Sequence, residues 1–534
     1  MKPITLLTIL TTTAPSYLGA QVVIDNANVV AGDVTINQTS ANEAQINQAS
    51  QQAIVDYNTF NIGVNGTVTF NQPNSEAAIL NRIIGGDPTT IDGTITANGQ
   101  LFFVNPAGMI FGNGASVSAE SLIAVAGNIT NENFLNACLE FDLSGDLVNN
   151  GNLQANERVI LAGDIVENNG NVVVTDGASI FTAGADTVYI QDSDSGIQLE
   201  LTNTGELSDS DTAITNNGSV EADEIMFSAG DVYASAIFEK GSTESTASTK
   251  YYADGADIEV AGTVTSTGGR IEIGGTDKGA DTATTARSVE IAETAEINAD
   301  GIEGGHIVVW SDGLTIVDGI ISALGIGEGS GGYAELSGSS VDLDLSRVNM
   351  GSGGKVLIDP TSLEVVSGTA GVDQVLASDI VTALNGGTAY ALEADDSVTI
   401  TADIIATTTG SEGTLSINAD ANDDGTGTLS GAGAITTGGI VNFDAKDYSG
   451  YSGALSGGTF NAQLYVTGVT GADRVYDATT DATVSGGSIT GFGADTLSLD
   501  TSSATASFGD KNVATDKSIT VIGYAVDTLS LIHI

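Results

Sequence analysis

A glycine-containing turn followed by an alternating apolar strand recurs along the middle of this chain. The triplet Asn-Asn-Gly occurs three times beside alternating apolar residues, at 149–151, 168–170 and 216–218. Gly-Gly precedes an alternating strand four times further on, at 268–269, 304–305, 331–332 and 353–354. One coil of about 20 residues cannot bury its apolar side chains alone, whereas stacked coils share one core and pair their backbone groups between rungs. The repeats therefore predict an all-β chain, folded as a right-handed parallel β-helix.

The composition agrees with many short strands joined by tight turns. The 534 residues include 68 Gly but 6 Pro, and Pro360 is the single proline after Pro106. Strand ladders exclude proline because it has no backbone N–H to donate, and tight turns need residues that accept positive φ. The 41% of hydrophobic residues suffice for a continuous core. We therefore expect β-helical repeats over 146–358.

The charge of the chain is strongly negative. Asp and Glu number 68 against 14 Lys and Arg, which gives a formal net charge of −54. Nucleic acids and anionic lipid surfaces would be repelled by such a chain. We therefore expect neither as a partner.

The first 20 residues match a cleavable secretory signal peptide. Lys2 precedes an apolar stretch at 4–10, and the small residues Gly19 and Ala20 end the segment. No later stretch reaches the roughly 18 apolar residues of a membrane-spanning helix, so we expect a secreted or surface-exposed protein without a stable transmembrane anchor. Cys138 is the single cysteine, which excludes an internal disulfide, and we expect it to be buried as a small hydrophobic residue.

Four linked motifs precede the repeats. They are DYNTFNIG (56–63), TVTFNQP (67–73), AAILNRIIGG (77–86) and ANGQLFFVNPAGMIFG (97–112). The last one places turn pairs on both sides of an apolar strand, which is typical of stacked strands joined by tight corners. In this order and spacing, the motifs resemble the N-terminal secretion domain of filamentous-haemagglutinin-type exoproteins, which two-partner secretion systems export. The resemblance covers residues 21–145.

This resemblance implies a cap on the β-helix that an outer-membrane barrel transporter recognises during export. It places Asn105, Pro106 and Gly108 in the recognised address. The further candidates for secretion recognition are Phe60, Asn61, Asn81, Arg82, Asn98, Gly99 and Met109. Alternatively, these residues only shape turns of the cap, and the two hypotheses are compatible.

Two features depart from the family pattern. Ala107 and Met109 stand where family members often carry Asn and Ile, and no Asn-Pro-Asn-Leu segment is present. The first departure leaves the Pro and Gly that set the backbone, and the second indicates a variant subgroup. Arg82 is the one cationic residue between Lys2 and Arg158. We expect it to pair with a nearby carboxylate, and contact with a secretion partner is the alternative.

The pattern changes near residue 359. A short amphipathic segment at 378–384 is followed by Asn385-Gly386-Gly387, which predicts a short helix with a glycine stop. Strand patterns then resume, so we expect a β-rich continuation with a small helical insertion over 359–460.

The last part of the chain carries a different signature. The segments RVYDATT (474–480) and FGDKNVATDKSITVIGY (508–524) resemble the YDG repeat, a small β-sandwich module of large bacterial surface proteins. Ala478 stands where that repeat usually has Gly. We expect one such module over 461–534, cut short at the end of a chain that is an N-terminal fragment of a longer protein.

Two segments resemble known ligand-binding loops, one for calcium and one for a dinucleotide. Asp420, Asn422 and Asp424 offer oxygen ligands at alternating positions before a glycine, as a calcium loop does, but position twelve is Gly431 instead of a bidentate Glu. The alternative is a solvated turn, and we expect no other cofactor. The run Gly327-x-Gly329-x-x-Gly332 formally matches a dinucleotide fingerprint. It does not follow a strand and open a helix, so we expect turn glycines there.

No arrangement in the sequence suggests an enzyme. The two histidines are His306 and His533, and basic residues are few and scattered. His306 lies near the sole tryptophan, Trp310, and we expect it to have a packing or rung-surface role. The resemblance implies a secreted adhesin that attaches to a receptor on host cells or other bacteria, whether glycan or protein. The alternatives are the stalk of a contact-dependent toxin with its active part beyond residue 534, and a β-helical polysaccharide lyase or hydrolase.

Overall fold

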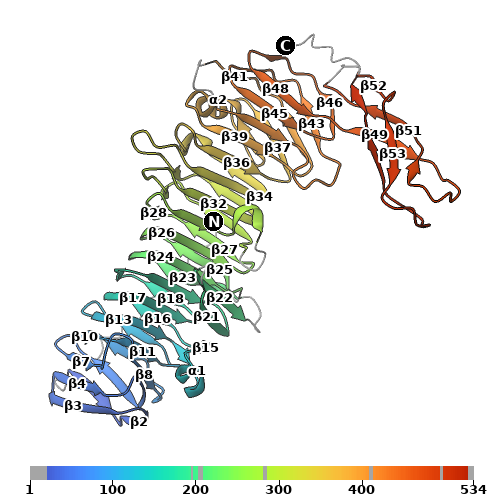
Figure 1. Cartoon of the computed structure of the whole chain (residues 1–534). Helices are drawn as coiled ribbons and strands as arrows, with labels where there is room; N and C mark the ends of the chain where they lie inside the picture. Colours follow the sequence, from blue (N-terminus) through green and yellow to red (C-terminus); the bar gives the residue numbers. More distant parts are fainter. Residues whose placement is uncertain are drawn as a thin grey trace.

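The computed structural model of the protein is an elongated stack of short strands with a smaller unit at its C-terminal end (Figure 1). It describes residues 21–193, 196–202, 208–231, 233–280, 285–407, 413–492 and 497–526. The signal peptide predicted at 1–20 lies outside these residues. The predicted all-β fold, a parallel β-helix, is confirmed.

Each rung of the helix contributes strands to three faces, and strands of neighbouring rungs pair in parallel. The first face consists of β4 (Glu43–Gln48), β7 (Thr67–Asn71), β10 (Thr94–Ala97), the first parts of β13 (Ser116–Val125) and β17 (Asn152–Gly163), β19 (Asn171–Val174), the first parts of β24 (Ser219–Ala229) and β26 (Ser242–Ala253), β28 (Thr263–Ser266), β31 (Glu296–Asn298), β33 (Ile320–Ser322) and β35 (Val348–Asn349).

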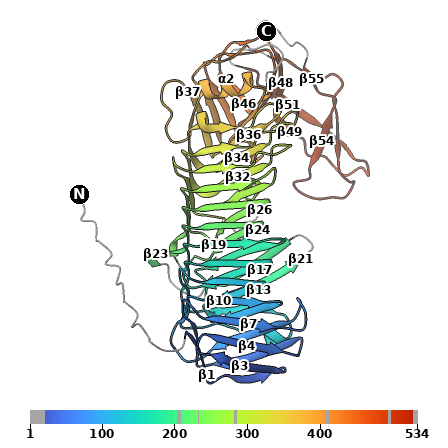
Figure 2. The ribbon, with the colours of Figure 1, turned by 90° about the vertical axis from the view of Figure 1, so that its left-hand side faces the viewer.

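The second face runs along most of the rod and extends furthest toward the C-terminal end. It consists of β5 (Gln52–Tyr57), β8 (Ala78–Ile83), β11 (Gln100–Val104), the later parts of β13 and β17, β20 (Ala178–Ala183), the later parts of β24 and β26, β29 (Arg270–Ile273), β32 (His306–Val317), β34 (Tyr333–Leu343), β36 (Lys355–Asp359), β39 (Ala389–Glu393), β42 (Leu415–Asn418), β45 (Ile440–Asp444) and β48 (Thr459–Gln463). Figure 2 shows β26, β32, β34 and β36 stacked in this way.

The third face closes the triangle. It consists of β6 (Thr59–Ile62), β9 (Thr89–Ile91), β12 (Met109–Phe111), β16 (Leu147–Asn149), β18 (Val166–Asn168), β23 (Ser208–Asn216), β25 (Tyr233–Glu239), β27 (Asp257–Val260), β30 (Ser288–Ile291) and the later parts of β32 and β34.

Alternation along each strand builds the core. In β27, Ile258 and Val260 point inward and are buried, whereas Asp257 and Glu259 point outward. The register pairs Ile258 with Val289 of the next rung, so inward positions stack on inward positions. The result is one apolar core that continues from rung to rung along the rod.

A buried ladder of amides also runs through the interior. It starts from the first Asn of each Asn-Asn-Gly triplet: Asn149 donates to Asn168 and Asn168 donates to Asn216, each over 2.7 Å. In the next rung Asn216 Nδ2 donates to both carboxylate oxygens of Glu239 at 2.9 Å. Because these polar groups satisfy one another, they stay buried without losing hydrogen bonds. The triplets therefore fix the registration of successive coils.

An antiparallel cap covers the N-terminal end of the rod (Figure 2). Its strands β1 (Val22–Asp25), β2 (Asn28–Ala31) and β3 (Val34–Ser40) pair with β6, β5 and β4 in turn. The parallel ladder then crosses residue 145 without a break, because β12 pairs with β16 and β13 with β17.

A small sheet lies outside the rod near the cap, and the sequence pattern did not predict it. It comprises β14 (Gly127–Asn128), β15 (Leu139–Leu143), β21 (Thr187–Ser193) and β22 (Gly196–Thr202), and α1 (Asn131–Leu135) lies beside it. These elements cover the outer side of the second face and form a second apolar cluster, in which the Phe102 and Phe134 rings meet edge to face at 5.1 Å. The prediction that Cys138 is buried is wrong, because this residue follows α1 at the surface and is partly exposed.

The ladder also crosses the change of pattern near residue 359. Lys355 of β36 pairs with Ala389 of β39, and the short helix predicted between them is α2 (Ala377–Asn385). Gly387 ends the helical segment with a φ of +86°, a conformation that favours glycine. Two further parallel sheets complete this part: β37 (Ser362–Val366) with β38 (Gln374–Leu376), β40 (Ser397–Ile400), β43 (Thr428–Gly431) and β46 (Asp447–Tyr451); and β41 (Ile404–Ala406), β44 (Ile435–Thr437) and β47 (Leu455–Ser456).

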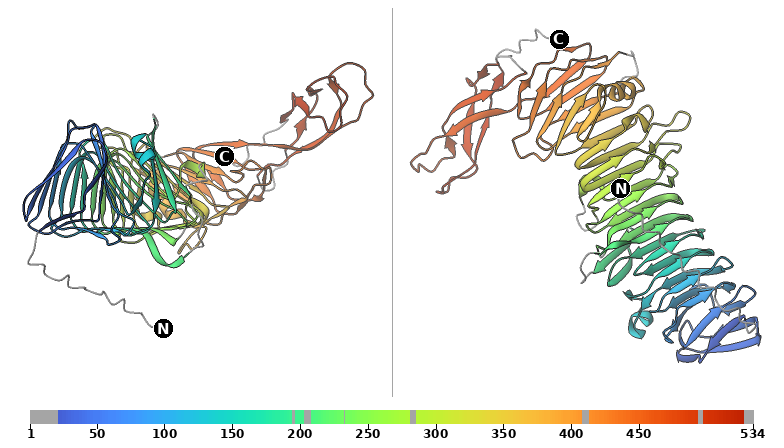
Figure 3. Two further views of the ribbon diagram at one scale, coloured as in Figure 1. Left: turned by 90° about the horizontal axis from the view of Figure 1, so that it is seen from below. Right: turned by 180° about the vertical axis from the view of Figure 1, so that it is seen from behind.

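The unit at the C-terminal end, which we call the distal module, is antiparallel and projects from the rod (Figure 3). Its pairs are β49 (Val466–Gly471) with β51 (Val484–Ile489), β50 (Asp481–Ala482) with β53 (Thr505–Phe508) and β54 (Ile519–Ile522), and β52 (Leu499–Asp500) with β55 (Ala525–Val526). Phe492 of the module packs against Phe443, Tyr448 and Tyr451 and so covers the end of the rod's core.

Candidate functional site

The predicted recognition corner at Asn105 is a tight, internally bonded turn. Asn105 is fully buried: its Nδ2 donates to the Asp87 carbonyl at 3.0 Å and to Thr89 Oγ1 at 2.9 Å, and its Oδ1 accepts from the Ala107 N–H at 2.9 Å. Pro106 is exposed at the tip. The side chain of Asn105 therefore holds the corner against the neighbouring rung.

Gly108 and Met109 complete this corner. Gly108 has a φ of +102°, and a Cβ there would lie 2.9 Å from the Asp146 carbonyl oxygen. Glycine is required by both the backbone conformation and the close approach. Met109 follows with its side chain buried in the core.

The other predicted turn, at Asn98 and Gly99, is tied to the preceding rung. Asn98 exchanges two hydrogen bonds with the Gln72 backbone, accepting from its N–H at 2.8 Å and donating to its carbonyl at 2.9 Å. A Cβ on Gly99 would lie 2.6 Å from the Ala77 carbonyl oxygen. Asn98 itself is exposed.

Phe60, Asn61 and Asn81 have structural contacts inside the cap. The Phe60 ring is buried and meets the Tyr57 and Phe103 rings edge to face, each at 5.2 Å. Asn61 Oδ1 accepts from the Thr90 N–H at 2.8 Å. Asn81 is buried, accepts from the Tyr57 hydroxyl at 3.0 Å and donates to the Phe102 carbonyl at 3.2 Å. Burial raises the pKa of Tyr57, so its hydroxyl keeps the proton that it donates.

Arg82 pairs with a carboxylate, as predicted. Its guanidinium lies 2.8 Å from Asp56 Oδ1, and its Nη1 donates to Asn131 Oδ1 at 2.8 Å. The contact joins the second face of the rod to the N-terminal turn of α1. Because both ionic side chains are 17% exposed, the pair is shielded but reachable from solvent.

Among the ten predicted recognition residues, the folded chain exposes Asn98 and Pro106 and buries or partly buries the rest. Their contacts show that they shape the cap, and their role in recognition stays a prediction. Sequence reasoning missed the partners that hold them: Asp56, Gln72 and Thr89. Asp56 and Gln72 lie inside two of the sequence motifs, so the motifs already contained these partners. Which residue each one contacts depends on how the rungs are aligned.

The calcium candidate forms a turn that is bonded to itself and to a lysine. Asp420 is buried, its Oδ1 accepts from the Gly425 N–H at 3.1 Å, and its Oδ2 lies 3.1 Å from Lys446 Nζ. Burial alone would raise the pKa of Asp420, but the hydrogen bonds from Lys446 and Gly425 outweigh it and lower the pKa. Asn422 and Asp424 accept from backbone N–H groups of their own turn. In the part of the chain that the structure describes, no three His, Cys, Asp or Glu residues are grouped to hold a metal ion, and calcium binding stays a prediction.

The other two expectations about single residues are confirmed. His306 lies on the rung surface, where its Nε2 is 2.7 Å from Asp277 Oδ1. Gly327 lies in a turn with a φ of +74°, and a Cβ on Gly332 would lie 2.1 Å from the Gly305 carbonyl oxygen. The glycine run therefore serves turns and close rung stacking.

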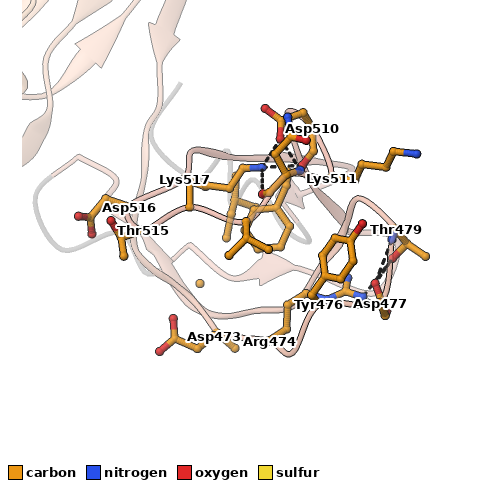
Figure 4. Close-up of a pocket in the computed structure, with 17 residues that line it drawn as sticks. Asp473, Arg474, Tyr476, Asp477, Thr479, Asp510, Lys511, Thr515, Asp516 and Lys517 are labelled. Carbon is orange, nitrogen blue, oxygen red and sulfur yellow. Dashed lines mark hydrogen bonds and ion pairs between the residues drawn. The ribbon is translucent and has the colours of Figure 1, made fainter.

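A cleft of about 710 Å³ lies in the distal module (Figure 4). Two loops form it, one around Arg474 and one around Lys517. Arg474 is held by an ion pair with Asp477 and a hydrogen bond to Thr479 at 3.0 Å. Lys517 pairs with Asp510 and donates to the Asn512 carbonyl at 2.8 Å. The cleft therefore combines fixed charges of both signs with exposed apolar side chains, among them Tyr476 at 60% and Val513 at 81% exposure.

The comparisons with known proteins agree with this architecture. The family model described as TPS secretion domain matches residues 20–309, more than half of the chain. The chain belongs to the TPS secretion domain family. The match extends past the boundary predicted at 145, along the continuous ladder. A second model, described as YDG domain, matches residues 461–529, the distal module.

Three proteins of Haemophilus influenzae are similar to the chain. A heme/hemopexin-binding protein of strain Rd is 27% identical over 240 residues, which are 43% of this chain and 26% of that protein. Another heme/hemopexin-binding protein is 36% identical over 124 residues, 23% of this chain and 13% of that protein. The crystal structure of the HMW1 secretion domain superposes with a TM-score of 0.50 at 21% identity, covering 69% of this chain and all of that one. The chain thus spans about a quarter or less of the curated relatives it matches, and the structural likeness shows the fold.

Family membership settles the export route. A TPS secretion domain belongs to a secreted exoprotein that crosses the outer membrane with the help of a dedicated transporter. Among the described residues, no helix has the length and apolar character needed to span a membrane. The family and the named relatives are of non-enzymatic kinds.

Proposed function

We propose that this exoprotein is an adhesin: the rod carries the distal module away from the cell, and the cleft of the module binds a receptor on another cell. The observation that supports this most is the exposure of apolar side chains around the cleft at the far end of the rod. Val513 is 81% and Tyr476 60% exposed, and both line the cleft. Exposed apolar groups rimmed by charges are typical of protein interaction sites.

Attachment of beads coated with the full chain to cultured cells tests this function. Replacing both Tyr476 and Val513 by Ser is expected to reduce attachment about tenfold, because aromatic anchors contribute most of the binding energy in such sites. Ile522→Ser is the matched control, since Ile522 is 64% exposed on β54 and does not line the cleft. Equal attachment by both variants and the original chain would refute the adhesive role of the cleft.

The names of the relatives favour a second candidate, the binding of a haem-carrying serum protein. It is tested by surface plasmon resonance with immobilised full chain and with haem-loaded hemopexin as the probe. Binding of the loaded protein that the Tyr476 and Val513 replacements abolish would assign the cleft to this ligand. Absence of binding at micromolar hemopexin would remove the candidate.

The recognition role of the cap needs its own experiment, because most of its residues also hold the fold. Pro106 is suitable, since it is exposed at the tip of the Asn105 corner. We expect Pro106→Ala to reduce secretion through the co-expressed transporter while leaving the melting temperature unchanged. The matched control is Pro73→Ala, another exposed proline of the cap. Secretion of the Pro106 variant at the level of the control would contradict the recognition role.

A further inference from the structure

A groove runs along one corner of the rod, where the four Gly-Gly pairs stack. Its volume is about 470 Å³, and its floor consists of the glycines at 268–269, 304–305, 331–332 and 353. Steric crowding explains the second glycine of each pair: a Cβ on Gly305, for example, would lie 2.3 Å from the Gly269 carbonyl oxygen. The corner therefore has no side chains, and the next residue of each rung forms a wall.

That wall belongs to a column of four side chains, one from each rung, of which the last three line the groove. Arg270, His306, Tyr333 and Lys355 stand directly above one another in the parallel register of β29, β32, β34 and β36. Successive rungs are about 4.8 Å apart, so the column presents one group per step along the rod axis. A linear molecule lying along the axis would meet these groups in sequence.

The column is held in place from one side. Asp277 of the short 3-10 turn η1 (Asp277–Gly279) lies 2.6 Å from Arg270 Nη2 and 2.7 Å from His306 Nε2. The His306 and Tyr333 rings are 4.5 Å apart between centroids, and Lys355 Nζ lies 5.8 Å from the Tyr333 ring. The two rings thus form a fixed aromatic platform that is partly open to solvent.

The floor excludes a peptide that would add itself to the rod as a β-strand. Each of the eight glycine N–H groups already donates to a carbonyl of the protein, for example Gly305 to Ala299 at 2.8 Å and Gly332 to Ala323 at 2.8 Å. A peptide strand needs free backbone partners at an edge to add itself to a sheet. A ligand in the groove would therefore be bound by its fit to the glycine floor and by the side chains of the wall.

The charges around the groove exclude a polyanion. Arg270 is neutralised by Glu272 and Asp277, at 2.6 Å each. Among the described residues Lys355 makes no ion pair, so a single free cation faces the groove on a chain with a net charge of −54. Repulsion by the whole chain would outweigh that one charge for a densely charged ligand.

We propose that this groove binds a neutral linear glycan along the rod axis. The C–H faces of the sugar rings pack on His306 and Tyr333, because the aromatic faces are electron-rich and apolar. Lys355 donates hydrogen bonds to sugar hydroxyls, which need no formal charge on the ligand. The groove is separate from the cleft of the distal module. Glycan binding here therefore does not depend on the adhesive role proposed for that cleft.

Binding of the full chain to four fluorescent hexasaccharides tests the proposal: cellohexaose, maltohexaose, mannohexaose and chitohexaose, with hexagalacturonate as the acidic comparison. At least one neutral probe is expected to bind, with an affinity that does not change between low and high salt because no charge pair is formed. Tyr333→Ala is expected to weaken binding about tenfold and Lys355→Gln about fivefold. Tyr333→Phe keeps the ring and is expected to stay within about threefold of the original chain.

Matched controls separate the groove from the rest of the surface. Tyr189→Ala removes a partly exposed tyrosine from β21, and Lys240→Gln removes an exposed lysine from another rung. Both are expected to bind like the original chain. The proposal is overturned if none of the four neutral probes binds, if hexagalacturonate binds better than they do, or if Tyr333→Ala and Lys355→Gln bind as tightly as the controls. Lys355 is exposed, so its variant tests the site even if replacement of Tyr333 perturbs the fold.

Discussion

The rod and the distal module bury their apolar residues to very different extents. In the rod, Phe181, Phe227 and Tyr251 stack on successive rungs with ring centroids 4.7 Å and 4.9 Å apart, and all three are buried. In the module, Val475 and Tyr476 are exposed, and ion pairs hold the loops. Stacking makes the core of the rod continuous, whereas several apolar side chains of the module are exposed to solvent. A stacked apolar core therefore holds the rod together, whereas ion pairs hold the loops of the module.

The largest effect on stability is expected from removing one of the stacked aromatic side chains of the rod. Phe227→Ala leaves a cavity between two stacked rings and should cost about 3–5 kcal/mol of stability. Tyr476→Ala in the module should change stability by no more than about 0.5 kcal/mol, because the side chain is 60% exposed. Urea unfolding followed by circular dichroism, which reports the strands of both regions, measures both in the full chain. Similar costs for the two variants would contradict this difference between the rod and the module.

The second effect concerns the acid at the end of the amide ladder. Burial raises the pKa of Glu239 from 4.5 to about 7, although Asn216, Tyr251 and the Gly241 N–H donate hydrogen bonds to it. Because the folded pKa is the higher one, the folded chain binds this proton more tightly than the unfolded chain. The free energy of unfolding therefore falls as pH rises from about 4.5 to about 7 and is constant above, a loss of about 3 kcal/mol.

Glu239→Gln tests this effect. A glutamine continues the amide ladder without a charge, so the variant should be more stable than the original chain by about 2–3 kcal/mol at pH 8 and lose the pH dependence. Urea unfolding at a series of pH values measures it, with the exposed Glu244→Gln of the next strand as the control. A variant that is less stable at pH 8 would show that the ladder requires the carboxylate.

The repeats could be predicted from sequence because each rung repeats the same local pattern, a turn followed by an alternating apolar strand. Asn149, Asn168 and Asn216 were visible as triplets, and their buried ladder follows from the register. Glu239 was missed because Glu-Lys-Gly replaces Asn-Asn-Gly in its rung, and only the register places it under Asn216.

The outer sheet, the cleft and the groove could not be predicted in the same way. The apolar run 101–104 lacks strict alternation, which indicates burial on both sides, but nothing in it names the elements that cover the outer side. The column at Arg270, His306 and Tyr333 spans intervals of 36 and 27 residues, so its members come together only through rung register. Local signals thus predict strands and turns, and register decides which side chains meet.

A smaller effect is expected in the module, at the residue that stands where the YDG repeat usually has glycine. Ala478 has a φ of +67°, a left-handed conformation that strains residues with a Cβ. Ala478→Gly relieves this strain but gives the unfolded chain more freedom, so we expect a net gain of about 0.5 kcal/mol. Ala472→Gly, at an exposed alanine of the same module, should lower stability instead. Differential scanning calorimetry of the full chain resolves the module if it melts apart from the rod, and a loss of stability in both variants would contradict the strain.

The smallest effect is expected from calcium, at the end of the rod that adjoins the module. Lys446 Nζ lies 3.1 Å from Asp420 and 3.2 Å from Asp423, so an ammonium already takes the place that a cation would have between these carboxylates. Calcium should leave the melting temperature of the original chain unchanged. In Lys446→Gln the two carboxylates lose their partner, and calcium should then raise the melting temperature, since a ligand that binds the folded state stabilises it. Magnesium is the control, because it demands a closer and more regular set of ligands than this turn offers. If calcium raises the melting temperature of the original chain, the loop at Asp420, Asn422 and Asp424 binds calcium without the Lys446 replacement, which would contradict this prediction.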